Sequence, residues 1–184
     1  NYEFTQQDLV EAMSWIAERN ELIEADVVFL TADYDGGLPL IAQLLPEAGI
    51  DPELVQYVGL SQWDVLPSAF HLPGIQGGWF AMPSPTRAEQ FRDRFQSVYG
   101  NAPHPLAAIA YDGVAAVGAS VATGNRDALK SKGLTLTGGF QGAAGIFRLR
   151  KNGTIERGLA VATIEGNQVV VLEEAPRTFS NFGF

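Results

Sequence analysis

Two kinds of apolar spacing alternate along the first hundred residues. Apolar residues between Leu9 and Ala17 recur at the 3.6-residue period of a helix, with Thr5 as its cap and an end near Asn20. Residues 25–32, "ADVVFLTA", instead form a short continuous run of apolar, β-branched and aromatic residues. Such a run is typical of a buried strand in a parallel sheet.

The same alternation continues to Gly100. Residues 38–48 carry a second helical stripe, and residues 55–60 and 77–83 read as two further buried strands. A third helix is expected over residues 85–99, followed by an Ala-rich helix over residues 104–122 and a short one over 126–132. Because helices are interspersed among the strands, the pattern predicts an α/β fold with a parallel, three-layer sheet.

The C-terminal third changes architecture. Its apolar segments at residues 146–150, 156–164 and 168–173 are separated by Asn152-Gly153 and by Gly166-Asn167. Residues that tolerate a positive φ are required in tight hairpin turns. The sequence therefore predicts a C-terminal antiparallel meander.

The glycine-rich stretch "GGFQGAAG", residues 138–145, raises the question of a phosphate-binding loop. Gly139, Gly142 and Gly145 are spaced by three, which matches neither the dinucleotide fingerprint nor the P-loop. A strand follows them, so there is no helix N-terminus to hold an anion. The stretch is interpreted as a tight backbone crossing that leads into a hairpin.

Composition removes several classes of function. The 184 residues contain no cysteine, so disulfides and thiolate chemistry are excluded. The formal net charge of −9 argues against nucleic acid or an anionic membrane surface as partner. His71 and His104 are isolated beside prolines, and no serine lies in a nucleophile elbow. We expect no catalytic residue, no metal and no cofactor.

Polar and aromatic residues gather directly after the first two predicted strands. Asp33 and Tyr34 follow the first, and Gln62, Trp63 and Asp64 follow the second. The carboxyl ends of parallel strands converge on the ligand crevice of an open α/β sheet, so these clusters should be neighbours. Carboxylates beside aromatic faces suit an ammonium group or a sugar. The alternative is structural, with Asp33 ending a strand and Trp63 filling a gap between elements.

The order of these features resembles a known family. The segments "ADVVFLTADYDGGLPLIAQLLPEAGI", "FRDRFQSVYGNAP" leading into "AYDGV", and "FQGAAGIFRLRKNG" are similar to the second half of type I periplasmic solute-binding proteins, the Leu/Ile/Val-receptor superfamily. "GLSQWD" and "GGWFAMP" are most similar to the branch of penicillin-binding-protein activators, the LpoA/LppC-like group.

The resemblance implies a periplasmic receptor of two lobes that close on a small polar solute, such as an amino acid, and that serves a membrane transporter. It places Asp33 and Tyr34, then Gln62, Trp63 and Asp64, at the solute. Gln62 or Trp63 stands roughly where the family has a glutamate, and Asp33 or Asp64 would replace that charge. The alternative is an interaction module that binds a cell-wall synthase.

The resemblance also assigns the parts of the chain. Residues 1–104 correspond to the second lobe, and residues 105–184 to a helix and meander that pack with the first lobe and return to the hinge. The chain begins on a helix, and the start of the first lobe is missing, so we expect a fragment. A lipid anchor would belong to a segment upstream. The Ala-rich helix is expected to bury its apolar side against the missing lobe.

Overall fold

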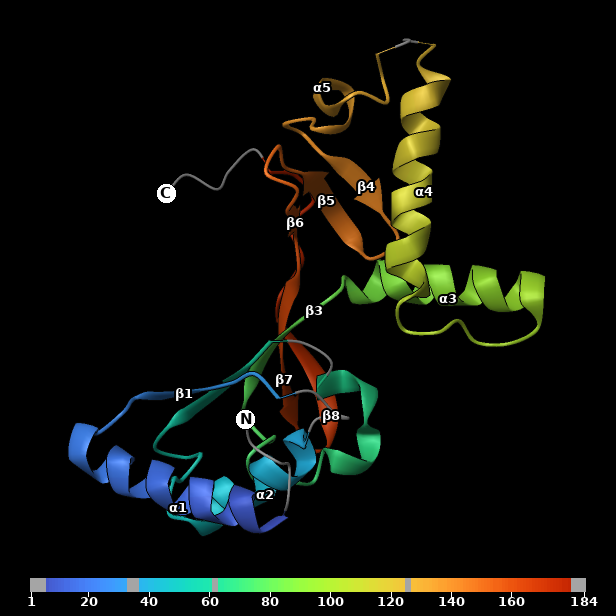
Figure 1. Ribbon diagram of the computed structural model, residues 1–184. Coiled ribbons are helices and arrows are strands. Elements are labelled where there is room, and N and C mark those ends of the chain that lie inside the picture. The colour runs from blue at the N-terminus through green and yellow to red at the C-terminus, as the bar shows by residue number, and fades with distance from the viewer. Residues whose placement is uncertain (1–5, 33–36, 61–62, 125–126, 180–184) are drawn as a thin grey trace. The chain divides into compact units, whose positions relative to one another are not determined.

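A computed structural model describes residues 6–32, 37–60, 63–124 and 127–179 of the chain. Helices and strands follow one another as the sequence predicts for the first two thirds (Figure 1). The elements are α1 (Gln6–Ile23), β1 (Val27–Leu30), α2 (Leu38–Glu47), β2 (Gln56–Gly59), the short 3₁₀ helices η1 (Trp63–Val65) and η2 (Pro67–Ala69), β3 (Trp79–Met82), α3 (Pro85–Tyr99), α4 (Ala107–Ala122), α5 (Ser131–Leu134), β4 (Phe140–Gly142), β5 (Gly145–Leu149), β6 (Ile155–Arg157), β7 (Ala160–Glu165) and β8 (Gln168–Glu173). The predicted cap Thr5 lies outside the described residues.

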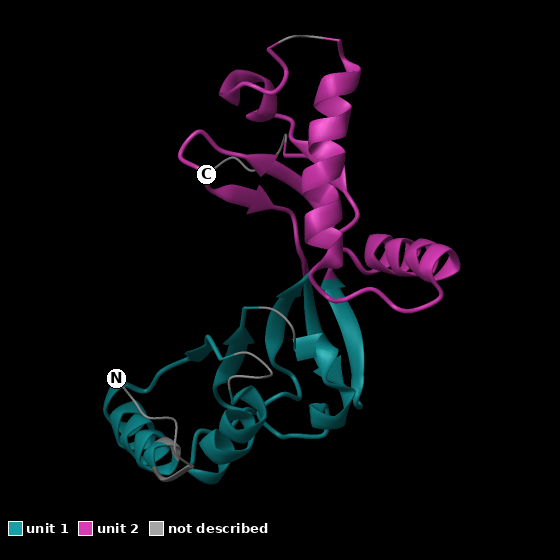
Figure 2. Ribbon diagram, turned by 45° about the vertical axis from the view of Figure 1, so that its right-hand side comes forward, with its two compact units in different colours: residues 1–82, 161–172 teal, residues 83–160, 173–184 magenta. Residues whose placement is uncertain are grey.

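The chain forms two compact units (Figure 2). Unit 1 comprises residues 1–82 and 161–172, and unit 2 comprises residues 83–160 and 173–184. The units divide the chain differently from the predicted boundary between residues 104 and 105, because α3 lies with α4 in unit 2 and residues 161–172, with most of β7 and β8, lie in unit 1. The assignment of the units to lobes of a larger protein stays a prediction.

Unit 1 is built on a five-stranded sheet of order β1-β2-β3-β7-β8. β1 pairs with β2 in parallel from Val27↔Gln56 to Leu30↔Gly59, and β2 pairs with β3 in parallel through Val58↔Trp79. These pairings confirm the parallel α/β arrangement predicted for the first three strands.

The core of unit 1 lies between α2 and the sheet strands. Leu38, Ala42 and Leu45 recur at helical spacing on α2 and are at most 2% exposed. Tyr57 of β2 is equally buried, and its hydroxyl donates a hydrogen bond of 2.7 Å to the carbonyl oxygen of Ile50, which follows α2. Burial, with a smaller contribution from a nearby carboxylate, raises the pKa of Tyr57 well above its usual value, so this hydroxyl stays a donor. The hydrogen bond joins the end of α2 to the sheet.

Unit 2 contains a separate antiparallel sheet of order β4-β5-β6, with α4 alongside β4 (Figure 1). The β5–β6 hairpin turns at Asn152-Gly153 as predicted, and Gly153 has a φ of 83°. The side chain of Asn152 accepts a hydrogen bond of 3.1 Å from the N–H of Thr154. The antiparallel character predicted for this part of the chain is confirmed.

The predicted meander is wrong in one respect. Residues 156–164 were expected to form one strand, but the chain leaves the three-stranded sheet after β6 and enters the five-stranded sheet as β7. Gly158 lies at the break. Its N–H donates to the carbonyl oxygen of Ile146, and a Cβ at this position would press against Pro176 and Ile146. Only a residue without a side chain fits at this point of the chain.

Two local features complete the strand pattern. Gly166 and Asn167 both have a positive φ, 56° and 62°, in the turn between β7 and β8, as the sequence predicts. Residues 140–142 form a strand, β4, where only a crossing was expected. Among the described residues, no helix is both long and apolar enough for a membrane span.

Candidate functional site

The two predicted site clusters leave from adjacent strand ends in unit 1. Leu30, the last residue of β1, lies directly beside Gly59, the last residue of β2, in the parallel register. Asp33, Tyr34 and Gln62 themselves lie outside the described residues. The two loops therefore start next to each other. That the side chains of Asp33, Tyr34 and Gln62 gather there stays a prediction.

Trp63 is the predicted site residue that the structure places most fully. Its side chain is 1% exposed and stacks on Phe80 of β3, with ring centroids 5.9 Å apart and an angle of 22° between the planes. The indole lies over Gly59 and Gly78, where any Cβ would overlap the ring. This packing matches the structural alternative, in which Trp63 fills a gap between elements. A direct contact between Trp63 and a solute stays a prediction.

The indole N–H of Trp63 is unusual for a buried donor. Within the part of the chain that the structure describes, it has no hydrogen-bond acceptor although it is shielded from solvent. A buried N–H without an acceptor costs about 1–3 kcal/mol. Ring stacking and burial against the described residues hold Trp63 in place.

Asp64 follows Trp63 within η1 and is half-buried. Because the stacked indole fixes the backbone next to it, the position of Asp64 relative to β2 and β3 is fixed as well. The arrangement can present a carboxylate near the end of β2. A carboxylate in this place is able to hold a cationic group of a small molecule.

A buried carboxylate organises unit 2. Asp112 of α4 is 1% exposed and accepts hydrogen bonds from the N–H groups of Ala143, at 2.5 Å, and Ala144, at 3.3 Å. It also forms an ion pair of 2.8 Å with Arg157 of β6. A Cβ at Gly142 would overlap the carboxylate. The glycine-rich stretch thus holds an anion after all, and that anion is the protein's own Asp112.

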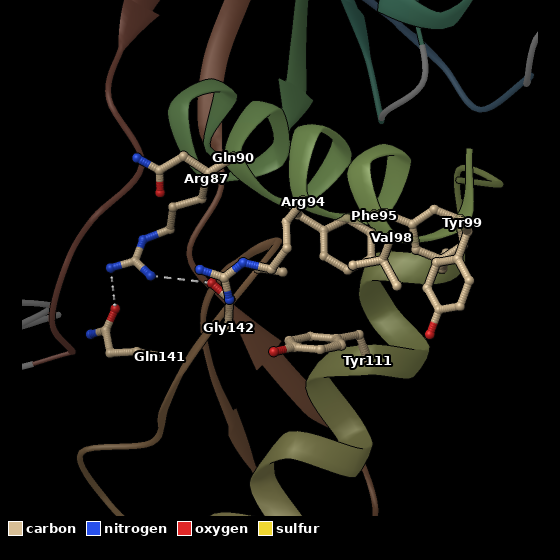
Figure 3. A pocket seen from close by; sticks show the side chains of 12 residues that line it. Arg87, Gln90, Arg94, Phe95, Val98, Tyr99, Tyr111, Gln141 and Gly142 are labelled. Atoms are coloured by element: carbon tan, nitrogen blue, oxygen red, sulfur yellow. Dashed lines mark hydrogen bonds between the residues drawn. The ribbon is translucent and has the colours of Figure 1, made fainter. Parts of the chain in front are cut away.

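An open cavity of about 450 Å³ lies within unit 2 (Figure 3). One face of α3, the first turns of α4 and the turn after β4 form its walls. The lining residues that Figure 3 labels are Arg87, Gln90, Arg94, Phe95, Val98, Tyr99, Tyr111, Gln141 and Gly142. Its volume is in the range of small-molecule sites, roughly 300–1,000 Å³.

The two histidines belong to different units, His71 to unit 1 and His104 to unit 2. His71 and His104 are both exposed, and the Nδ1 atom of His104 accepts a hydrogen bond of 3.2 Å from the N–H of Leu106. Within the described ranges, no group of three or more His, Asp or Glu residues could hold a metal ion.

Sequence reasoning missed both the Asp112 cluster and the cavity. Phe91, Phe95 and Val98 recur at helical spacing in the helix predicted over residues 85–99, but this spacing does not reveal that Arg87 and Arg94 line the same cavity. Asp112 stood out only as part of "AYDGV". The available signal was a charged residue between apolar neighbours on a predicted helix, which indicates either a buried ion pair or a site.

Comparison with solved structures identifies the fold. A leucine-binding protein, LivK, from Thermotoga maritima matches with a TM-score of 0.60 and 18% identity, over 89% of this chain and 48% of its own length. An ABC transporter substrate-binding protein from Desulfitobacterium hafniense matches with a TM-score of 0.63 and 19% identity, over 94% and 50%. This chain therefore spans about half the length of these two structures.

A third match comes from a different kind of protein. The C-domain of LpoA from Haemophilus influenzae, a regulator of PBP1A, matches with a TM-score of 0.53 and 12% identity, over 89% of this chain and 49% of its own length. At such identities the likeness concerns the fold alone. No curated protein matches the sequence.

The family is established by the sequence itself. A family model described as periplasmic binding protein matches residues 1–168, which is most of the chain. The sheet of unit 1 with its parallel β1–β2 and β2–β3 pairs, the antiparallel sheet of unit 2 and the structural matches agree with it. The chain belongs to the periplasmic binding protein family.

Proposed function

We propose that the chain is about half of an extracytoplasmic receptor that binds a small polar solute between two lobes and delivers it to a membrane transporter. The observation that carries this proposal is the register of β1 and β2, which starts both polar loops from adjacent strand ends. In open α/β sheets, ligands bind outside the carboxyl ends of the strands. The family assignment and the amino-acid receptors among the structural matches support the same class of ligand.

The site would consist of the residues after β1 and β2. Asp33 and Asp64 would hold a cationic group such as an ammonium, and Tyr34 and Gln62 would contact the body of the solute. We assign Trp63 a positioning role, because its buried ring fixes the segment that carries Asp64. No cofactor or metal has a part in this function.

The exposed side of α4 supports the idea that a further part of the protein covers unit 2. Val114, Val117 and Val121 follow helical spacing and are 74%, 44% and 54% exposed. The opposite side of the helix, with Asp112 and Ser120, is buried. Exposed apolar stripes of this kind usually mark a contact surface. In the longer protein, α4 would pack in the first lobe.

A melting experiment on the full-length protein that contains this chain tests the proposal. A panel of amino acids and related small solutes is added, each well above its expected dissociation constant. Ligand at 100 times that constant adds about 2.7 kcal/mol to the free energy of unfolding. A clear rise in melting temperature with at least one solute is expected, and no rise with any member of the panel would count against a receptor.

A second candidate is an interaction module that regulates a cell-wall synthase. The observations that favour it are the LpoA C-domain among the structural matches and the segments "GLSQWD" and "GGWFAMP". Affinity capture from an envelope extract should then recover a penicillin-binding protein by identification of its peptides. Failure to recover one under conditions that retain a known complex would exclude this role.

A further inference from the structure

We propose that the cavity of unit 2 binds a small molecule with a carboxylate at one end and an aromatic or branched hydrocarbon body at the other. This site lies wholly within unit 2 and shares no residue with the proposed solute site of unit 1. It therefore does not rest on the proposed receptor function.

The cavity has a polar end and an apolar end. Figure 3 shows the guanidinium groups of Arg87 and Arg94 reaching toward Gln141 and Gly142, and the hydroxyl of Tyr111 turned to the same side. Phe95, Val98 and Tyr99 lie toward the other end (Figure 3). A ligand with one charged end and one apolar end fits such a division.

The sign of the charge at the polar end is positive. Two arginines line the cavity, and none of its lining residues is an aspartate or a glutamate. This is a marked local reversal in a chain with 21 acidic and 12 basic residues. A guanidinium group recognises a carboxylate through paired hydrogen bonds. The charge pattern therefore favours an anionic ligand.

One of the two arginines is held by the protein and the other is available. Arg87 donates hydrogen bonds to the side chain of Gln141, at 2.8 Å, and to the carbonyl oxygen of Gly142, at 3.3 Å. Gln141 in turn donates to the carbonyl oxygen of Arg177, at 2.7 Å. The guanidinium of Arg94 is exposed and has no acceptor among the described residues. Arg94 is thus the group that would pair with the carboxylate.

The apolar end is already ordered by ring contacts. Phe91 contacts Phe95 and Tyr111 at centroid distances of 5.9 and 5.3 Å, and Phe95 contacts Tyr99 at 4.5 Å. Val98 and Tyr99 are nevertheless 66% exposed. A hydrocarbon body placed against these rings would remove apolar surface from water, which stabilises the complex by about 25 cal/mol per Å².

Calorimetric titration of the chain with phenylpropionate tests the site, with uncharged phenylpropionamide as the matched probe. We expect phenylpropionate to bind with a dissociation constant in the millimolar range or below, and the amide to bind about tenfold more weakly. Raising the salt concentration should weaken binding of the anion. Equal binding of the two probes, or no binding of phenylpropionate, would overturn the proposal.

Two variants of α3 locate the binding. Arg94→Gln should weaken phenylpropionate by about tenfold, and Arg94→Lys should restore part of the affinity. Arg92→Gln is the matched control, because Arg92 is exposed on the same helix and does not line the cavity. Amide chemical shifts of Gly142 and Ala143 should move during the titration of the wild type. An equal loss in both glutamine variants, or shifts confined to other residues, would contradict this location.

Discussion

In each unit, glycines without side chains leave room for a buried side chain, but that side chain is an indole in unit 1 and a carboxylate in unit 2. In unit 1 the indole of Trp63 lies over Gly59 and Gly78, and in unit 2 the carboxylate of Asp112 lies against Gly142. The indole N–H has no acceptor among the described residues, whereas the carboxylate is bound by two backbone N–H groups and by Arg157. The first contact depends on shape, and the second on charge and hydrogen bonds.

The largest effect is expected from removal of the buried carboxylate. Asp112→Ala would leave Arg157, whose side chain is 16% exposed, without its partner, and the N–H groups of Ala143 and Ala144 without an acceptor. Breaking a buried pair in this way costs about 3–5 kcal/mol. Urea unfolding measures it, with the exposed Asp93→Ala as control. A loss similar to that of Asp93→Ala would show that the cluster does not stabilise unit 2.

A smaller effect is expected from filling the space under the indole. Gly59→Ala would place a Cβ within the ring of Trp63, and overpacking of this kind costs roughly 1–3 kcal/mol. Gly118→Ala is the matched control, because it lies within α4 and its Cβ would meet nothing within 4 Å. That control should be neutral or slightly stabilising, since alanine favours a helix.

A double variant tests whether the loss of stability in Gly59→Ala comes from overlap with the Trp63 ring or from the backbone conformation at Gly59. Trp63→Phe gives a smaller ring, so the combined Gly59→Ala and Trp63→Phe variant should lose less stability than the sum of the two single changes. Urea unfolding of the three variants supplies the comparison. Simple additivity would mean that Gly59 is required for its backbone conformation instead.

The smallest effect concerns a half-buried carboxylate on the same sheet as Arg157. Glu156 of β6 forms ion pairs with Arg148, at 2.8 Å, and with Arg150. Hydrogen bonding to Arg148, with a further contribution from Arg150, holds the pKa of Glu156 below its usual value. A lowered folded-state pKa means that the stabilisation is present above the unfolded pKa, about 4.3, and is lost as pH falls through the folded one.

The contrast with Asp112 is therefore testable by pH. Glu156→Gln should lower the urea midpoint slightly at neutral pH, and the difference from wild type should vanish in acid, where the carboxylate is protonated. A difference that persists unchanged in acid would show that Glu156 acts through packing rather than charge.

Local patterns predicted most of the elements. The spacing of Leu38, Leu45 and their neighbours gave α2, and the positive φ of Gly166 and Asn167 follows from their residue types. The need for a glycine at position 158 could not be predicted, because it comes from the side chains of Ile146 and Pro176, which lie far from Gly158 in the sequence. Short strands carry too few residues for their sheet to be assigned from periodicity.

The candidate site was predictable only in part. Strand ends at Leu30 and Gly59 follow from the order of elements, so their adjacency was expected. The burial of Trp63 was not, because a tryptophan after a strand is equally suited to stacking on a ligand and to filling a gap over glycines. The cavity of unit 2 combines α3, α4 and β4, and no local pattern connects Arg94 with Tyr111 or Gln141.

The most direct test of the receptor proposal is calorimetric titration of the full-length protein with the solute that raises its melting temperature most. Wild type is compared with Asp33→Asn, Asp64→Asn and the control Asp93→Asn, which makes the same chemical change on the exposed side of α3. The account predicts that Asp33→Asn or Asp64→Asn weakens binding by about tenfold or more and that Asp93→Asn does not. Unchanged affinity in both site variants would contradict it.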